Sequence, residues 1–184
     1  ETIDVMLAMH SKGLTNIGVV LQGRLHRTES DIDSICSSLA DKTDFRICKG
    51  IYLEPGNIAH TNYSDIVEAT NRAVTSMLDR GAYTAIASHD FPVIDHALAE
   101  LRNRGMDNSD STGLEKKGPG YEFQFLLGVR GDVRRGLASK GHLTRVYVPY
   151  GTRWYEYGLR RLRENPEVAS HVVKALLMPW TNRR

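Results

Sequence analysis

Polar residues that can bind a ligand or transfer protons recur in this sequence where short apolar runs end. They follow five successive runs, as Gln22, Lys49, Ser88-His89-Asp90, Gln124 and Tyr147–Tyr150. The carboxyl ends of parallel strands meet at one edge of an α/β sheet, and such folds place their sites at that edge. A single polar residue there is usually a helix cap, but five together predict a binding or catalytic site.

Two cations lie within one of these apolar runs, "FRICKGIY" at residues 45–52. An unpaired buried cation is strongly destabilising, so Arg46 and Lys49 need an anion or a dipole near the end of the strand. The two residues are three apart, and a regular strand would direct them to opposite faces. They can serve one ligand only if the strand ends or bends near Gly50.

Adjacent arginines, Arg160 and Arg161, lie in the helical pattern "LRRLRE" at 159–164. Two interpretations stay open. The arginines could form a solvated helix face, with Glu156 and Arg160 paired one turn apart. Alternatively, their guanidinium groups bind a small carboxylate in a bidentate fork, which lysine cannot copy. The second interpretation requires the helix to lie across the mouth of the site.

The composition is that of an ordinary globular protein, with 41% hydrophobic and 25% charged residues. The net charge of +2 gives no reason to expect a nucleic-acid partner. No glycine-rich phosphate loop, nucleophile elbow or metal-ligand spacing is present, so we predict no metal site. Cys36 and Cys48 have no CxxC partner and are predicted to be reduced packing thiols in an intracellular protein.

Apolar runs and amphipathic stretches alternate along the chain, which predicts a parallel sheet. Strands are predicted at 17–22, 45–52, 83–88, 121–128 and 143–151, with helices between them. Five strand–helix units fit either a flavodoxin-like doubly wound sheet or an incomplete (β/α)8 barrel, and the pattern alone does not decide. The helix after Ser64, its predicted N-cap, should bury Ile66, Val67, Ala69, Ala73, Val74, Met77 and Leu78.

Six stretches occur in the order and spacing of one known family: "GVVLQ", "RICKGIY", "SHD", "YEFQFLLGVR", "RVYVPYG" and "WYEYGLRRLRENP". The sequence resembles the proline dehydrogenases, flavin enzymes that also form the first half of the bifunctional proline utilisation A proteins. The resemblance covers nearly the whole chain. It implies an α/β fold, an incomplete (β/α)8 TIM-like barrel with about five βα units. Residues 1–184 would be the C-terminal portion of a single barrel domain, with FAD at the carboxyl ends of the strands.

The resemblance also implies roles for individual residues. Arg46 matches the arginine beside the flavin N5 edge, whose charge would stabilise the electron-rich reduced flavin. The other residues that match cofactor contacts are Gln22, Lys49, Gly50, Ile51, Ser88, His89 and Gln124. The residues that match the substrate pocket are Leu126, Tyr147, Arg160, Arg161 and Glu164. In this pocket the arginines would hold the proline carboxylate, and Glu164 would orient them.

The implied activity is oxidation of L-proline to pyrroline-5-carboxylate by hydride transfer to flavin N5, the first step of proline catabolism to glutamate. A quinone is the implied electron acceptor. The protein would then be cytoplasmic, with a peripheral contact at the inner membrane. Tyr157, four residues ahead of Arg161, matches the family members that select proline over hydroxyproline.

The family's substrate-binding lysine and flavin-side aspartate lie on barrel strands that would precede the helix at Glu1. We expect a preceding segment to supply them, because a barrel without two strands exposes its core. Two other functions stay open: a non-catalytic barrel that binds a small carboxylate, and a flavodoxin-like electron carrier with FMN. The sequence departs from the family pattern at Gly23-Arg24 (Ala-Tyr), Ile51 (Ala), Ser88 (Thr) and Asp90 (Asn).

Overall fold

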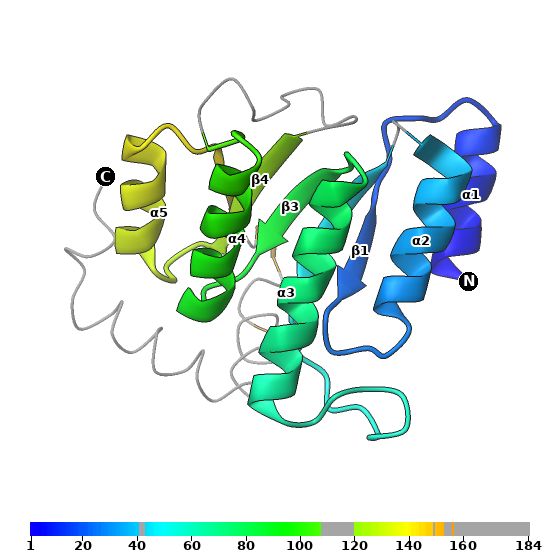
Figure 1. The fold of residues 1–184 in the computed structure, drawn as a ribbon, viewed down its shortest axis with the longest axis horizontal. Coiled ribbons are helices and arrows are strands. Elements are labelled where there is room, and N and C mark those ends of the chain that lie inside the picture. The colour runs from blue at the N-terminus through cyan, green and yellow to red at the C-terminus, as the bar shows by residue number, and fades with distance from the viewer. Residues whose placement is uncertain (41–42, 108–119, 149, 153–155, 157–184) are drawn as a thin grey trace.

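A five-stranded sheet forms the centre of this computed structural model, which describes residues 1–40, 43–107, 120–148, 150–152 and 156 (Figure 1). The chain alternates strand and helix from the first strand onward, as predicted. The strands are β1 (Val19–Gln22), β2 (Asp44–Cys48), β3 (Tyr83–Ala87), β4 (Gly120–Leu126) and β5 (Thr144–Tyr147). The helices are α1 (Thr2–Ser11), α2 (Thr28–Leu39), α3 (Tyr63–Asp79), α4 (Phe91–Asn103) and α5 (Gly131–Ser139).

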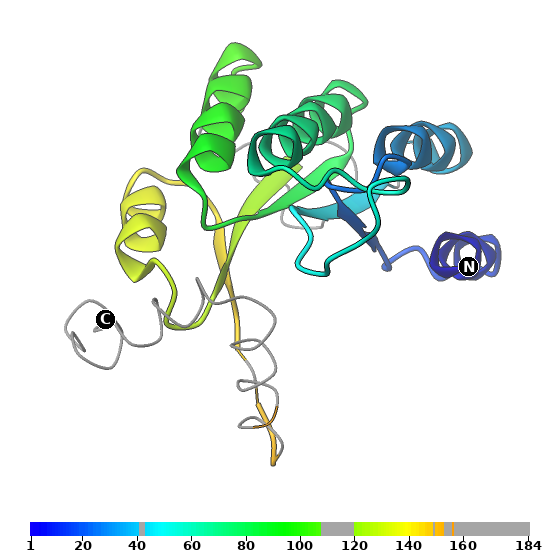
Figure 2. The same ribbon diagram turned by 90° about the horizontal axis from the view of Figure 1, so that it is seen from below.

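The strand order decides between the two folds that the sequence left open. All pairings are parallel, and the order in the sheet is β1-β2-β3-β4-β5, which is also the order in the chain. A flavodoxin-like sheet has a switch in strand order and helices on both faces. Here α2 to α5 lie around one side of a curved sheet (Figure 2). This is the arrangement of consecutive units in a (β/α)8 barrel, so the barrel prediction is confirmed for the part that this chain contributes.

The two faces of the sheet differ in chemistry because side chains alternate along each strand. On β2, Phe45 and Ile47 are buried against the helices, whereas Arg46 between them points to the other side, here called the inner face. The helix-covered face is largely apolar, with Ile86 and Phe123 also fully buried, although Thr84 lies buried beside Phe45. The inner face instead carries charged and amide side chains, so it is the face that can hold a polar ligand.

The amphipathic pattern of α3 is confirmed in full. All seven apolar residues predicted to face the core are buried, and five of them belong to the main hydrophobic core: Val67, Ala73, Val74, Met77 and Leu78. Packing of this apolar face contributes more to the stability of α3 than helix propensity does, as is usual for amphipathic helices in proteins. Within the described ranges, no helix combines the length and the apolar character needed to cross a bilayer.

Two local predictions need correction. Helix α3 begins at Tyr63 with Asn62 in the N-cap position, so Ser64 is already helical. Strand β2 ends at Cys48, earlier than the apolar run suggested, because Gly50 has a φ of +99° that no strand residue adopts. A further finding is that His10 of α1 is buried, and its ring nitrogen Nε2 hydrogen-bonds the backbone carbonyl of Ile17.

Candidate active site

The polar strand ends do gather at one edge of the sheet, as predicted. The parallel register places Gln22 beside Cys48 and Leu126 beside Tyr147, so these strands finish at the same level. The segments that follow the strands contain Lys49 and the Ser88-His89-Asp90 turn. Of the predicted site residues, the structure brings together Gln22, Arg46, Lys49, Gly50, Ile51, Ser88, His89, Gln124, Leu126 and Tyr147 along this edge.

The early end of β2 resolves the conflict between its two cations. Arg46 lies within the strand and points to the inner face, where its Nε donates to the Gln124 Oε1 at 2.6 Å. Lys49 lies beyond the last strand residue, Cys48, so the alternation of the strand no longer restricts its direction. The two charges therefore serve the same edge, one with an amide dipole as its partner and one with a carboxylate.

The carboxylate partner of Lys49 is Asp90, at the N-cap of α4. The Lys49 Nζ and the Asp90 Oδ2 are 2.6 Å apart, and the Tyr63 hydroxyl donates to the same oxygen at 2.7 Å. Burial alone would raise the pKa of Asp90, but the hydrogen bonds from Lys49 and Tyr63 hold that pKa below its ordinary value. Asp90 is thus a carboxylate at neutral pH and competes with any anionic ligand for Lys49.

Two buried polar atoms beside Gly50 have no hydrogen-bond partner among the described residues. They are the Oε1 of Gln22 and the Nε of Arg24. Arg24 is only 6% exposed, and its Nη1 donates to the backbone carbonyl of Tyr52. Buried polar atoms are almost always satisfied in native proteins, so a donor and an acceptor left open side by side fit a ligand with groups of both kinds.

Gly50 permits this close approach between β1 and the turn after β2. A Cβ at this position would lie 2.6 Å from the Gln22 Oε1 and 2.7 Å from the Arg24 Cδ. Such contacts are shorter than any real Cβ tolerates, and the φ of +99° favours glycine for a second reason. The half-buried Ile51 follows directly. A glycine turn held against open polar atoms is a suitable cradle for a planar or phosphorylated cofactor.

The Ser88-His89-Asp90 turn is ordered by backbone hydrogen bonds. The backbone amide of Leu126 donates to the His89 Nε2 at 3.0 Å, so this nitrogen is the acceptor in that bond. The buried Ser88 hydroxyl oxygen accepts from the Asp90 amide at 3.1 Å. The first bond connects the turn after β3 to β4 at the site edge, and it favours a positioning role for His89 over a proton-transfer role.

A shallow cavity of about 160 Å³ opens where β4 passes into α5. Leu126 lines it together with residues 127–129, with Val146 of β5 and with Gly131, Arg134 and Arg135 of α5. Tyr147 ends the neighbouring strand at the same edge and is 49% exposed. The remaining predicted site residues, Arg160, Arg161 and Glu164, lie outside the described residues.

The sequence reasoning missed three residues on the inner face: Tyr83, Glu122 and Arg145. Glu122 is fully buried, and it accepts hydrogen bonds from Arg145, from the Tyr83 hydroxyl and from the Gln124 amide. Burial and the neighbouring Glu122 carboxylate both raise the pKa of Tyr83, so its hydroxyl stays protonated and donates. The signal was present in the sequence: Glu122 and Arg145 interrupt apolar strands at inner-face positions, where a charge needs a partner across the sheet.

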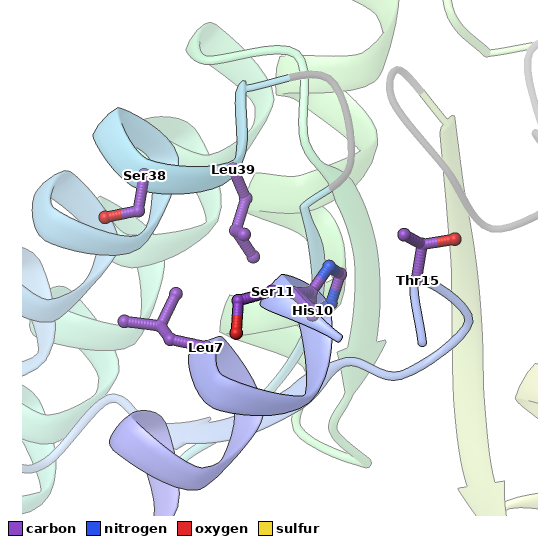
Figure 3. A pocket seen from close by; sticks show the side chains of 6 residues that line it. All are labelled: Leu7, His10, Ser11, Thr15, Ser38 and Leu39. Atoms are coloured by element: carbon purple, nitrogen blue, oxygen red, sulfur yellow. The ribbon is translucent and has the colours of Figure 1, made fainter. Parts of the chain in front are cut away.

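A second cavity, of about 380 Å³, lies at the opposite edge of the sheet. Figure 3 shows its lining from α1, from the end of α2 and from the loop before β1: Leu7, His10, Ser11, Thr15, Ser38 and Leu39. The amino-terminal edge of a barrel contributes to stability rather than catalysis. No three His, Cys, Asp or Glu side chains could hold a metal ion together anywhere in the described part of the chain.

The consecutive parallel strands and the polar carboxyl edge define a barrel-type α/β protein whose candidate ligand site lies at the strand ends. The family model described as Proline dehydrogenase matches residues 1–174, and this chain therefore belongs to the proline dehydrogenase family. It is 36% identical over 166 residues to the proline dehydrogenase of Deinococcus radiodurans, covering 90% of this chain and 49% of that protein. Proline dehydrogenase 2 of Bacillus subtilis is 34% identical over 176 residues, covering 96% of this chain and 54% of that protein.

The chain spans about half the length of these curated relatives. A solved structure confirms the fold. Proline utilization A from Bdellovibrio bacteriovorus, inactivated by N-propargylglycine, superposes with a TM-score of 0.72 and 18% sequence identity. The match covers 89% of this chain and 18% of that longer protein.

Proposed function

We propose that the protein carrying this chain oxidises L-proline to pyrroline-5-carboxylate with bound FAD, the first step of proline catabolism to glutamate. The observation that carries the proposal is the position of the Arg46 guanidinium. Gln124 holds it on the inner face of the sheet, towards the carboxyl ends of consecutive parallel strands. A fixed cation in a partly dry site favours the build-up of negative charge beside it. Such charge develops on a hydride acceptor.

The inner-face residues fit FAD as far as the structure describes them. The open Oε1 of Gln22 can accept a hydrogen bond from a ring N–H, and Gly50 lets the cofactor approach the backbone. Lys49 and Ile51 would contact the cofactor next to this turn, and Ser88 and His89 would contact it from β3. When bound, FAD would supply the hydride acceptor that no side chain provides.

The substrate would lie between the cofactor and the ends of β4 and β5. Leu126 and Tyr147 would pack on the proline ring, while Arg160 and Arg161 would hold its carboxylate with Glu164 as their anionic partner. These contacts orient the substrate so that C5 faces the acceptor, which converts a bimolecular step into a nearly unimolecular one. A hydride leaves C5 and the ring nitrogen loses a proton to solvent, giving the C=N bond of pyrroline-5-carboxylate.

Three further parts of the proposal concern the whole protein. This chain would be the C-terminal portion of a single barrel domain whose other strands carry the remaining substrate and flavin contacts. A quinone would accept the electrons, and the cytoplasmic protein would reach it through a peripheral contact at the inner membrane.

The visible spectrum of the natural gene product, before and after anaerobic addition of L-proline, tests the proposal. Flavin bands that bleach with L-proline, and that bleach far more slowly when Arg46 is replaced by Lys, are the expected result. Flavin bands indifferent to L-proline would mean another substrate. A colourless protein that cannot be loaded with FAD but binds L-proline by calorimetry would replace the proposal with a non-catalytic carboxylate-binding barrel.

A further inference from the structure

A continuous row of four polar side chains crosses the inner face of the sheet: Arg46, Gln124, Glu122 and Arg145, here called the polar row. Arg46 Nε donates to the Gln124 Oε1 at 2.6 Å, and Gln124 Nε2 donates to the Glu122 Oε1 at 2.5 Å. Arg145 closes the row with three hydrogen bonds to both carboxylate oxygens of Glu122, at 2.8, 3.0 and 2.8 Å. The row joins β2, β4 and β5 side chain to side chain.

The order of donors and acceptors in the polar row decides which way the Gln124 amide faces. A carboxylate only accepts hydrogen bonds, so the NH2 group of Gln124 must face Glu122. The amide oxygen then has to face Arg46, which only donates. If Glu122 could not accept, the amide could rotate and present its NH2 group to the guanidinium, donor against donor. Glu122 therefore keeps the amide oxygen of Gln124 facing Arg46, where it accepts the hydrogen bond from the guanidinium.

Glu122 is itself held from two sides. It is fully buried, and its Oε2 also accepts from the Tyr83 hydroxyl at 3.0 Å. In the register of β4 and β5, Arg145 lies opposite Gln124, yet its guanidinium bonds to Glu122 instead. This diagonal contact leaves the Gln124 amide to bridge Glu122 and Arg46. An ion pair that only joined two strands would need no such bridge.

We propose that Glu122 is a positioning residue: through Gln124 it fixes the plane of the Arg46 guanidinium, and Arg145 fixes Glu122. Nε lies in the guanidinium plane, so holding this atom restricts the direction of the whole group. The inference rests on the proposed function, in which Arg46 lies beside FAD. A well-placed guanidinium raises the flavin midpoint potential because it favours the state with more negative charge. A loosely held one raises it less.

The test measures the flavin midpoint potential of the natural gene product loaded with FAD. Glu122→Gln removes the acceptor-only group. The double variant Glu122→Met with Arg145→Met removes the buried pair together, so no lone charge remains inside. Both are expected to keep flavin and to lower the midpoint potential by about 30 mV, the two-electron equivalent of a tenfold change in the oxidation equilibrium. Glu100→Gln, which alters another arginine-held carboxylate on the outer helix α4, should leave the potential unchanged.

The route through Arg46 is tested by repeating both changes in an Arg46→Lys background. Lysine has no Nε to hold, so the potential should show no further fall there. Unchanged potentials in both Glu122 variants, with flavin bound, overturn the inference and leave the polar row a strand-joining element. A further fall of the same size in the Arg46→Lys background also overturns it. A wild-type protein that cannot bind FAD overturns the proposed function instead, so the two failures are distinguishable.

Discussion

Replacing Gly50 with alanine should damage stability and cofactor binding together, because Gly50 combines a positive φ with a close approach. Its φ is +99°, and an added Cβ would lie 2.6 Å from the Gln22 Oε1 and 2.7 Å from the Arg24 Cδ. Arg24 is buried and Gln22 is half-buried with its Oε1 enclosed, and both lie at the candidate site. The methyl group can be accommodated only if Gln22 or Arg24 moves from its place.

Gly13 is the matched control, since it shares the conformation and lacks the contact. Its φ is +87°, and no heavy atom lies within 4 Å of the added Cβ. A side chain at positive φ costs about 1–2 kcal/mol, and the lower entropy of the unfolded alanine chain offsets about 0.4–1 kcal/mol of it. Gly13→Ala should lower the free energy of unfolding by about 1 kcal/mol. Overpacking adds about 1–3 kcal/mol, so Gly50→Ala should lower it by about 2–4 kcal/mol.

Urea unfolding of the natural gene product measures both variants, and fluorescence titration with FAD measures the cofactor affinity. Gly50→Ala should weaken FAD binding about tenfold, equivalent to about 1.4 kcal/mol, while Gly13→Ala leaves it unchanged. Equal losses of stability in the two variants would show that the turn is not packed against Gln22 and Arg24. That result would refute the reasoning, because the conformational cost alone would then explain both.

Three more substitutions are expected to have separable effects. Gln124→Leu removes the acceptor of the half-buried Arg46, and steady-state kinetics with L-proline should show kcat/KM reduced about 10- to 100-fold, the equivalent of one hydrogen bond to a charged group. Asp90→Asn frees Lys49, so titration with FAD should show a lower Kd; the variant should lose about 1 kcal/mol of stability at pH 7. Because the pKa of Asp90 is lowered in the folded protein, the stability difference between the wild type and Asp90→Asn is present above the ordinary pKa of 3.8. It disappears as the pH falls through the folded pKa, and acid unfolding of both proteins measures this loss. Arg24→Met should raise the Kd for FAD about tenfold without lowering the free energy of unfolding; a loss of stability at unchanged affinity would mean that Arg24 only clamps Tyr52.

Much of the fold follows from local patterns in the sequence. The apolar stripe of α3 is strong enough that every predicted core residue is buried. Strand order is different, because alternating strands and helices produce the same local pattern in an open sheet and in a barrel. Only the long-range pairing of each strand with its successor separates the two, and no segment encodes that pairing by itself.

The sequence predicts those site residues that can be recognised one at a time, from their own position in the pattern. Gln22 and Lys49 follow apolar runs, so the rule that sites lie at strand ends finds them. The partners of the inner-face charges were not found, since Arg46 and Gln124 are 78 residues apart in the chain. Whether Arg46 and Lys49 could act together depended on where β2 ends, and the positive φ of Gly50 determines that point.

Charges within strands carry more information here than polar residues at strand ends. A barrel interior is normally filled by branched apolar side chains, and Arg46, Glu122 and Arg145 occupy that space instead. Apolar replacement of a buried ion pair is often neutral or stabilising, so packing alone gives no reason to keep these residues. The proposed positioning role explains their presence: the polar row would hold the Arg46 guanidinium in a fixed direction beside a ligand. In this family, a buried acid at the Glu122 position should therefore accompany an amide two residues later, because the acid has no positioning role without it.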